Sequence, residues 1–442
     1  MELCRWKVQQ LGRHQAWAQT ANDRCQLRVA QALIRFGPVL MVALSMLILA
    51  DIPETFHDNP YPIYKELREN HPLCWQPDGS VILSRFEDLN TVYRDTTTFI
   101  SDKKQVFAPK FGAETPLYQH HTTSLVFNDP PLHTRVRSIM VGAMSPRALA
   151  DLRPAIVALV DRLLDDLAEL DDVDLISDFA AAIPVSVIGN LFDIPHEQRA
   201  PLRDWSLAIL GALEPVLTPE QQAEGNAAVT DFVALLEHIV ADRRLHPGDP
   251  ETDVLTRLLQ GQGGDALTAQ ELYQNCIFIL NAGHETTTNL IGSGLALIAR
   301  DAGLRAALIA NPDLWPTAID EVLRLESPNQ FGNRLTTEDV TFHGETVPAG
   351  TDIHLCIGAA NRDPQMFQNP DQFDPKRRPN KHLAFGGGPH TCVGLSLARM
   401  EGEIALRGFL RRYPNFELLL DTTRSKRIRF RGFASLPAVL EL

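Results

Sequence analysis

A glycine-rich loop carries a cysteine whose surroundings suggest metal chemistry. The loop is FGGGPHTCVG, residues 385–394, and a helical pattern, LSLARMEGEIALRGFL, follows it directly. Consecutive glycines let a backbone turn tightly and approach a flat ligand closely. A helix that begins beside Cys392 turns its free amide groups and positive dipole end toward the sulfur, which favours the thiolate. A thiolate is the form that binds a metal, so the sequence predicts Cys392 as a metal ligand.

Two other roles for Cys392 remain open from the residues alone. A buried cysteine is commonly a small, chemically inert hydrophobe. Cys392 could also be an enzyme nucleophile with His390 as its base. We expect this second arrangement to be geometrically poor.

A second group of polar residues lies inside a long apolar helix. Thr268 and Glu271 form a capping box, and the helical pattern continues to about Arg300. The pattern is apolar on nearly all sides, so this helix should cross the middle of the protein. Within it, residues 282–288 read AGHETTT, in which glycine and threonine are poor helix formers. Such local conflicts are typical of functional sites, although a polar patch on a helix face would look similar.

Each residue of this group suggests a specific task. Ala282 and Gly283 are small and leave room above a cofactor plane. The hydroxyl of Thr286 can bond backward to the helix and open space for oxygen or water. Glu285 cannot stay unpaired in an apolar interior, so it must reach water, a partner or a proton path.

The two motifs together resemble the cytochrome P450 family, in the form common among its soluble bacterial members. The loop matches the family's haem-thiolate pattern, and residues 282–287 match its Ala-Gly-x-Asp/Glu-Thr-Thr motif. The resemblance implies haem b (iron protoporphyrin IX) as cofactor, with Cys392 as the axial iron ligand. It also implies that Glu285 relays protons and that Thr286 hydrogen-bonds dioxygen. The residues that it places around the cofactor are Ala282, Gly283, Phe385, Gly386, His390 and Gly394.

The same resemblance assigns roles to charged residues outside the two motifs. Glu321 and Arg324, at i and i+3 of a helix, correspond to the family's Glu-x-x-Arg, and Arg377 is a candidate third member of that structural network. Taken alone, such a pair is usually a solvated surface pair. The expected haem propionate donors are His133, Arg137, Arg334 and His390.

The elements that must position these residues are mainly helical. We expect helix, strand, turn, strand and helix over 60–95, a loop over 100–127, and helices over about 150–170, 175–192, 198–213 and 219–244. Strands are expected at 340–356 and 427–440. The predicted fold is mainly α with small β-sheets in a single large domain, the triangular prism of cytochrome P450.

Composition narrows the class of protein further. The net charge of -14 argues against nucleic-acid binding, and six cysteines without a Cys-x-x-Cys argue against disulfides or zinc and fit a reducing cytoplasm. The apolar run at 36–50 is shorter than the roughly 20 residues of a membrane span. We therefore expect an N-terminal extension at 1–50, or a true start at Met41 or Met46, followed by the haem domain at 51–442.

The expected activity is insertion of one oxygen atom of O2 into a lipophilic small molecule. No flavin- or nicotinamide-binding stretch follows the cysteine loop, and the sequence has no ferredoxin-like cysteine cluster. We therefore expect a separate ferredoxin or flavodoxin with its reductase to supply electrons. A basic docking patch could comprise Arg135, Arg147, Lys381 and Arg399. Pocket walls are expected at Phe278, Ile279 and Ala282, residues 101–125, and residues 329–331. The alternatives are a peroxide-driven enzyme, which the intact Glu285–Thr286 pair disfavours, and a haem-binding sensor.

Overall fold

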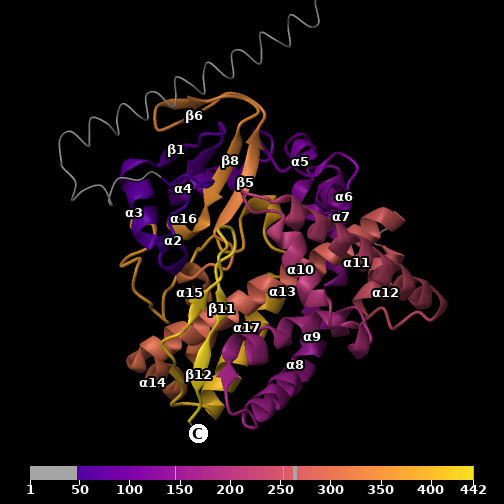
Figure 1. Ribbon diagram of the computed structural model, residues 1–442, viewed down its shortest axis with the longest axis vertical. Helices are drawn as coiled ribbons and strands as arrows, with labels where there is room; N and C mark the ends of the chain where they lie inside the picture. The colour runs from indigo at the N-terminus through magenta and orange to yellow at the C-terminus, as the bar shows by residue number, and fades with distance from the viewer. Residues whose placement is uncertain (1–46, 145, 252, 262–265, 442) are drawn as a thin grey trace, which may run out of the picture.

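The computed structural model describes residues 47–144, 146–251, 253–261 and 266–441. Helices dominate, and small sheets lie toward one end and one side of the molecule (Figure 1). The expected class, mainly helical with small β-sheets in one large domain, is confirmed.

Helix α13 (Ala269–Arg300) runs through the middle of the helical body (Figure 1). Its capping box is present as predicted: the Thr268 hydroxyl accepts from the Glu271 amide at 3.2 Å, and the Glu271 carboxylate accepts from the Thr268 amide at 2.8 Å. Helices from both halves of the chain pack around α13, so most of its side chains are buried. This burial is what fixes the orientation of the polar residues at 282–288.

The other helices follow the chain in a simple order. Before α13 come α2 (Thr55–Asp58), α3 (Tyr61–Asn70), α4 (Phe86–Arg94), α5 (Lys104–Phe111), α6 (Pro116–Thr123), α7 (Leu132–Ala143), α8 (Pro146–Leu167), α9 (Ala182–Leu191), α10 (Leu202–Gly211), α11 (Pro219–Leu245) and α12 (Val254–Gln260). After it come α14 (Ala302–Ala310), α15 (Trp315–Leu325), α16 (Ile357–Ala360) and α17 (Leu395–Arg412). Single turns lie at η2 (Leu125–Phe127), η4 (His196–Gln198), η5 (Pro312–Leu314) and η6 (Gly388–His390), and a π-helical segment, η3 (Leu175–Ala180), precedes α9.

The largest sheet has five strands in the order β1-β2-β8-β5-β3. These are β1 (Leu73–Trp75), β2 (Val81–Leu83), β8 (Asp352–Cys356), β5 (Phe331–Thr336) and β3 (Phe99–Ile100). Only the β2–β8 pair is parallel. Three smaller sheets use β6 (Val340–Phe342) with β7 (Glu345–Val347), β10 (Thr423–Arg424) with β11 (Phe433–Ser435), and β4 (Val173–Asp174), β12 (Pro437–Val439) and β9 (Glu417–Leu418).

Most predicted elements are present, but one region was predicted wrongly. The segment expected as a loop at 100–127 contains helices α5 and α6. Phe107, Phe111 and Leu117 are buried there, so tertiary packing holds helices that the weak periodicity of the sequence did not indicate. The expected strand region at 427–440 holds strands only at 433–435 and 437–439.

The predicted N-terminal extension lies almost wholly outside the described residues, because residues 1–46, including Met41 and Met46, are not among them. Its last part is packed. Leu47 and Leu49 are buried, and the Gln76 side chain bonds both, accepting from the Leu49 amide at 2.9 Å and donating to the Leu47 carbonyl at 3.0 Å. Within the described ranges, no helix has the length and apolarity needed to span a bilayer.

Candidate active site

The cysteine loop is a tight turn that leads directly into helix α17. Gly386 and Gly388 have φ of 68° and 62°, in the left-handed region that L side chains rarely adopt. The Cys392 amide donates to the Phe385 carbonyl at 3.0 Å, which closes the loop. Gly394 then caps α17, so the cysteine sits just before the first turn of that helix.

Close packing gives the glycines a further purpose that the sequence did not indicate. A Cβ on Gly388 would lie 2.1 Å from the Tyr93 carbonyl oxygen, and one on Gly387 would lie 3.1 Å from the Tyr93 Cβ. Both glycines therefore let the loop pack against the end of α4. Protein packing therefore gives these two glycines a reason to lack a side chain.

The Cys392 thiol does not have the low pKa that its position before a helix suggested. The residue keeps a solvent-accessible face. Protein atoms around the sulfur nevertheless raise the thiol pKa by desolvation, and this outweighs the Gly394 amide and the charges of Arg137 and Arg399, which lower it. The Gly394 amide therefore favours the thiolate, as expected from the helix start, but by less than burial opposes it. Coordination to a metal ion would displace the thiol proton and supply the missing stabilisation.

Four basic side chains meet beside the cysteine loop. The rings of His133 on α7 and His390 in the loop lie 3.9 Å apart, centroid to centroid. Arg137, one turn after His133, donates to the Thr391 carbonyl at 2.6 Å. Burial, together with the charges of Arg334, His133 and Arg137, lowers the pKa of His390 to about 2. The structure thus brings together the four residues that the sequence predicted as propionate donors.

This basic group fits a cofactor that carries carboxylates. His133 Nε2 and Arg334 Nε are buried and have no hydrogen-bond partner among the described residues. Unsatisfied buried donors are costly, and a carboxylate would satisfy them and oppose the positive potential that depresses the His390 pKa. The nearest acid, Asp129, already accepts from the amides of Ser101 and Asp102. The residues present therefore fit the two propionates of haem.

The threonine of the central helix adopts the predicted geometry. The Thr286 hydroxyl donates to the Ala282 carbonyl at 2.6 Å, one turn back along α13. Gly283 has a different reason for being small: a Cβ there would lie 2.3 Å from Ile188 Cδ1 on α9. Packing against Ile188 therefore accounts for a residue without a side chain at 283, and its place beside a cofactor stays a prediction.

Glu285 is buried and has an ion-pair partner that the sequence did not reveal. Arg427 donates to Glu285 Oε2 at 3.0 Å and to the Leu207 carbonyl at 2.8 Å. Burial raises the pKa of Glu285 to about 7, although the Arg427 charge lowers it. No spacing rule links the two residues, since 142 positions separate them. A carboxyl with this pKa can both hold and release a proton near neutral pH.

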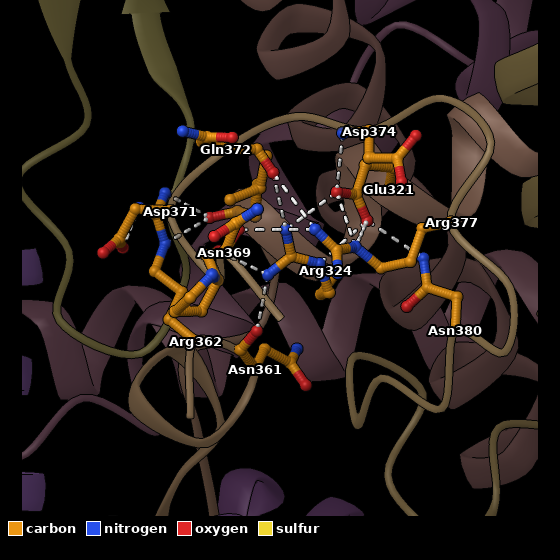
Figure 2. Close-up of polar contacts among 12 residues, drawn as sticks. Glu321, Arg324, Asn361, Arg362, Asn369, Asp371, Gln372, Asp374, Arg377 and Asn380 are labelled. Atoms are coloured by element: carbon orange, nitrogen blue, oxygen red, sulfur yellow. Dashed lines mark hydrogen bonds and ion pairs between the residues drawn. The ribbon is translucent and has the colours of Figure 1, made fainter. Parts of the chain in front are cut away.

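The predicted Glu-x-x-Arg pair is a fully buried network rather than a surface pair. Glu321 and Arg324 on α15 have no exposed side-chain surface, and two nitrogens of Arg324 donate to the carboxylate at 2.8 Å each (Figure 2). Arg324 also donates to the carbonyls of Asn361, Pro370 and Gln372. These five bonds use all five N–H groups of the guanidinium.

Residues that precede the cysteine loop complete this network. The predicted contact of Arg377 is present: its Nε lies 3.0 and 3.1 Å from the two Glu321 oxygens (Figure 2). The Asp374 amide and the Asn380 side chain donate to the same carboxylate. The network thus ties α15 to the segment that leads into the cysteine loop.

Two members of the expected basic patch are already paired. Arg135 pairs with Glu271, and Arg399 donates to Asp320 at 2.7 Å. Lys381 is exposed. The side chain of Arg147 lies outside the described part of the chain.

One residue of the expected pocket wall has a structural role. Gln330 donates to the Ser327 carbonyl at 2.6 Å, so it satisfies backbone at the start of β5.

Comparison with known proteins identifies the family. The model of the family described as Cytochrome P450 matches residues 36–313 and 306–439. The biotin biosynthesis cytochrome P450 of Bacillus subtilis (strain 168) is 34% identical over 397 residues, which cover 87% of this chain and 97% of that protein. The 6-deoxyerythronolide B hydroxylase of Saccharopolyspora erythraea is 30% identical over 404 residues, or 88% and 98% of the two chains.

Solved structures agree with this result. P450BioI, in complex with an acyl carrier protein ligated with hexadec-9Z-enoic acid, superposes with a TM-score of 0.82 at 33% identity, covering 88% of this chain and 100% of that chain. The chain belongs to the cytochrome P450 family. It is a haem-thiolate monooxygenase with the P450 fold.

Proposed function

We propose that Cys392 is the axial ligand of haem b, iron protoporphyrin IX, and that His133, Arg137, Arg334 and His390 hold its two propionates. The observation that carries this proposal is the meeting of four basic side chains beside the cysteine loop, where buried nitrogens of His133 and Arg334 have no partner in the described part of the chain. The remaining residues proposed to surround the haem are Ala282, Gly283, Phe385, Gly386 and Gly394, with Gly283 acting by admitting Ile188.

Bound in this position, the haem supplies the activation of O2. We assign proton delivery to Glu285, whose pKa near 7 suits a group that gains and loses protons at neutral pH. Arg427 holds the carboxylate in place, because it is anchored at the same time to the Leu207 carbonyl. Thr286 is proposed to present its hydroxyl to dioxygen from the facing turn of α13. Glu321, Arg324 and Arg377 are proposed to hold the segment that carries Cys392.

The substrate is proposed to be a lipophilic small organic molecule, and the electron donor a ferredoxin or flavodoxin served by its reductase. Named relatives act in biotin biosynthesis and on 6-deoxyerythronolide B, which supports an organic substrate of substantial apolar surface. A haem domain at 51–442 and a cytoplasmic location remain part of the proposal, the second supported by scattered cysteines that form no disulfide among the described residues.

A reduced-CO difference spectrum tests the ligand assignment. Haem-loaded wild-type protein should show the red-shifted band of a thiolate-ligated haem, and Cys392→Ala should lose it completely, because no other cysteine occupies the loop. Cys276→Ala, which removes a deeply buried thiol on α13, is the matched control and should keep the band. Persistence of the band in Cys392→Ala would refute the assignment.

Charge reversal at Arg399 tests the partner surface. Arg399→Glu removes a partly exposed positive charge from the start of α17 and also breaks its pair with Asp320. We expect the apparent Km for the ferredoxin or flavodoxin to rise several-fold, with a weaker dependence on salt. Asp320→Asn, which breaks the same pair but keeps Arg399, should not raise Km. If Arg399→Glu has the same Km and the same salt dependence as the wild type, Arg399 does not belong to the docking surface for the electron donor.

A further inference from the structure

A second group of cations, half-buried at Lys110 and Arg429, lies away from the haem-propionate residues, where α5, the end of α10, strand β5 and the 427–429 segment meet. Lys110 on α5 donates to the Glu214 carbonyl at 2.7 Å. Arg429 donates to the Leu213 carbonyl at 3.1 Å, and to Phe331 O and Asn333 Oδ1 on β5 at 3.1 and 3.2 Å. All these acceptors are neutral, so both positive charges are held without an ion pair.

The carboxylates nearby are already used. Glu214 accepts from the backbone amides of Ile428 and Arg429, at 3.0 and 3.3 Å. Asp352 is bonded to Lys103, whose side chain is completely buried. An ion pair requires a carboxylate oxygen within 4.0 Å of a charged side-chain nitrogen. Among the described residues, no carboxylate oxygen lies that close to the side-chain nitrogens of Lys110 or Arg429. Glu214 and Asp352 therefore act on these two cations by their charge at a distance, not through direct ion pairs.

The formal charges of this group give the sign and size of the charge that a ligand would have to balance. Lys103, Lys110 and Arg429 contribute three positive charges, and Glu214 and Asp352 contribute two negative ones, which leaves one positive charge. Burial and the charge of Arg429 lower the pKa of Lys110 to about 8, as expected for an ammonium in a positive, desolvated place. Arg334, which also acts on Lys103, belongs to the haem-propionate group and is not counted here.

This group adjoins the residues proposed for catalysis. Arg429 is two residues after Arg427, which binds Glu285, so one short segment contacts both the proton-bearing acid and the excess positive charge. Arg429 also contacts the carbonyl of Phe331, one of the residues expected in the pocket wall. A ligand that reached the haem from this junction would pass beside Lys110 and Arg429.

We propose that the substrate of this monooxygenase is a lipophilic carboxylic acid whose carboxylate binds Lys110 and Arg429. This inference rests on the proposed function, and it adds the chemical class of the substrate and the two residues that select it. A monoanion matches the single uncompensated charge, and a carboxylate can accept from an ammonium and a guanidinium at once. The apolar body would then extend from the junction of α5 and β5 toward α13.

Isothermal titration calorimetry of the haem-loaded full chain tests the proposal without using turnover. The probes are straight-chain acids of about ten to sixteen carbons and the primary amides of the same acids. A charged hydrogen-bonded contact predicts at least about 10-fold tighter binding of the acid than of the amide. Lys110→Gln and Arg429→Gln should each abolish most of this difference. Lys110→Gln still offers a donor to the Glu214 carbonyl, so its fold should be retained.

Lys104→Gln is the matched control, since Lys104 lies on the same helix but pairs at the surface with Asp102. It should keep the preference for the acid. Equal binding of acid and amide, failure of the whole acid series to bind, or a preference that survives both Lys110→Gln and Arg429→Gln would overturn the proposal. The reduced-CO spectrum of the same samples separates this failure from failure of the haem assignment, because it reports the thiolate ligand alone.

Discussion

The network beneath the cysteine loop and the middle of helix α13 are both deeply buried, yet they satisfy their polar atoms to different degrees. In the network, every N–H of Arg324 has an acceptor, and Glu321 binds two arginines, an amide and Asn380, although Asn380 Oδ1 has no partner among the described residues. On α13, Asn281 and His284 have no side-chain hydrogen bond among the described residues, and neither do the Asn289 amide nitrogen and the Ser293 hydroxyl.

The contrast shows which region is built to be complete by itself. A buried polar atom without a partner costs about 1–3 kcal/mol, so a protein keeps such atoms only where another group can satisfy them. A cavity of about 10 Å³ lies beside His284, which is the room that one water needs. We therefore regard the network as a scaffold that fixes the cysteine loop. We regard the middle of α13 as the part of the site that binds water and small molecules, and call it the receiving side.

The largest effect is expected from breaking the scaffold at Arg324. Arg324→Lys keeps the charge but offers three donors instead of five, and it cannot reproduce the planar fork that binds Glu321. At least two of the five buried acceptors would lose their donor, at about 1–3 kcal/mol each, so we expect the free energy of unfolding to fall by about 3–5 kcal/mol. Chemical denaturation of the haem-loaded protein measures the change.

The control for this variant is a pair at the surface. Lys65 and Glu69 lie 3.9 Å apart with both side chains more than half exposed, so Lys65→Ala should cost less than about 1 kcal/mol. A loss in Arg324→Lys as small as that in Lys65→Ala would show that the network is not a scaffold, and the contrast with α13 would lose its meaning.

The sequence was sufficient where a short segment determines its own geometry. The capping box of α13, the backward bond of Thr286 and the tight cysteine loop each depend on residues that are close in the chain. The family resemblance added the longer-range prediction that Arg377 contacts Glu321. The first three features follow from local rules of helix and turn formation, and the contact of Arg377 follows from the resemblance to cytochrome P450.

The sequence was not sufficient where distant segments meet. Arg427 pairs with Glu285, and Ile188 fills the space beside Gly283, only because the fold brings 188, 283 and 427 together. Helices α5 and α6 were missed for the same reason, since their stability comes from burial against other elements. The raised pKa of Cys392 also depends on three-dimensional desolvation, which a loop motif does not report.

A smaller and pH-dependent effect is expected from Glu285 on the receiving side. Its pKa is about 7 in the folded protein against an ordinary value of 4.5. The native state therefore keeps its proton between these values while the unfolded state loses it, and stability falls as pH rises from 4.5 to 7. In Glu285→Gln this decline should be smaller by up to about 3 kcal/mol, measured by denaturation across that pH range.

Turnover gives a second readout for Glu285. If Glu285 carries protons, the wild-type rate should change near pH 7 and Glu285→Gln should lose that inflection along with most of its rate. Glu66→Gln, at a half-exposed position on α3, should behave as wild type in both assays. Stability curves of wild type and Glu285→Gln that stay parallel with pH would show that Glu285 is not a carboxyl with a raised pKa.

The sharpest test of the comparison uses the same residue type in the two regions. Asn361 and Asn281 are both almost fully buried. Asn361 donates to the Ser327 hydroxyl and accepts from the Leu383 amide, each at 2.7 Å, whereas neither polar atom of the Asn281 side chain has a partner among the described residues. Leucine has a similar size but no polar atoms. Asn361→Leu should therefore destabilise by about 2 kcal/mol, since it orphans the Leu383 amide.

Asn281→Leu should change the free energy of unfolding by less than about 1 kcal/mol, because no protein hydrogen bond is lost and the polar atoms that it removes are unsatisfied. The two variants can be compared by denaturation under identical conditions, with the reduced-CO spectrum confirming that haem is bound. Equal destabilisation would mean that Asn281 has partners as strong as those of Asn361, and α13 would then be as self-sufficient as the network. A large difference would instead assign the unsatisfied polar atoms of α13 to the receiving side of the site.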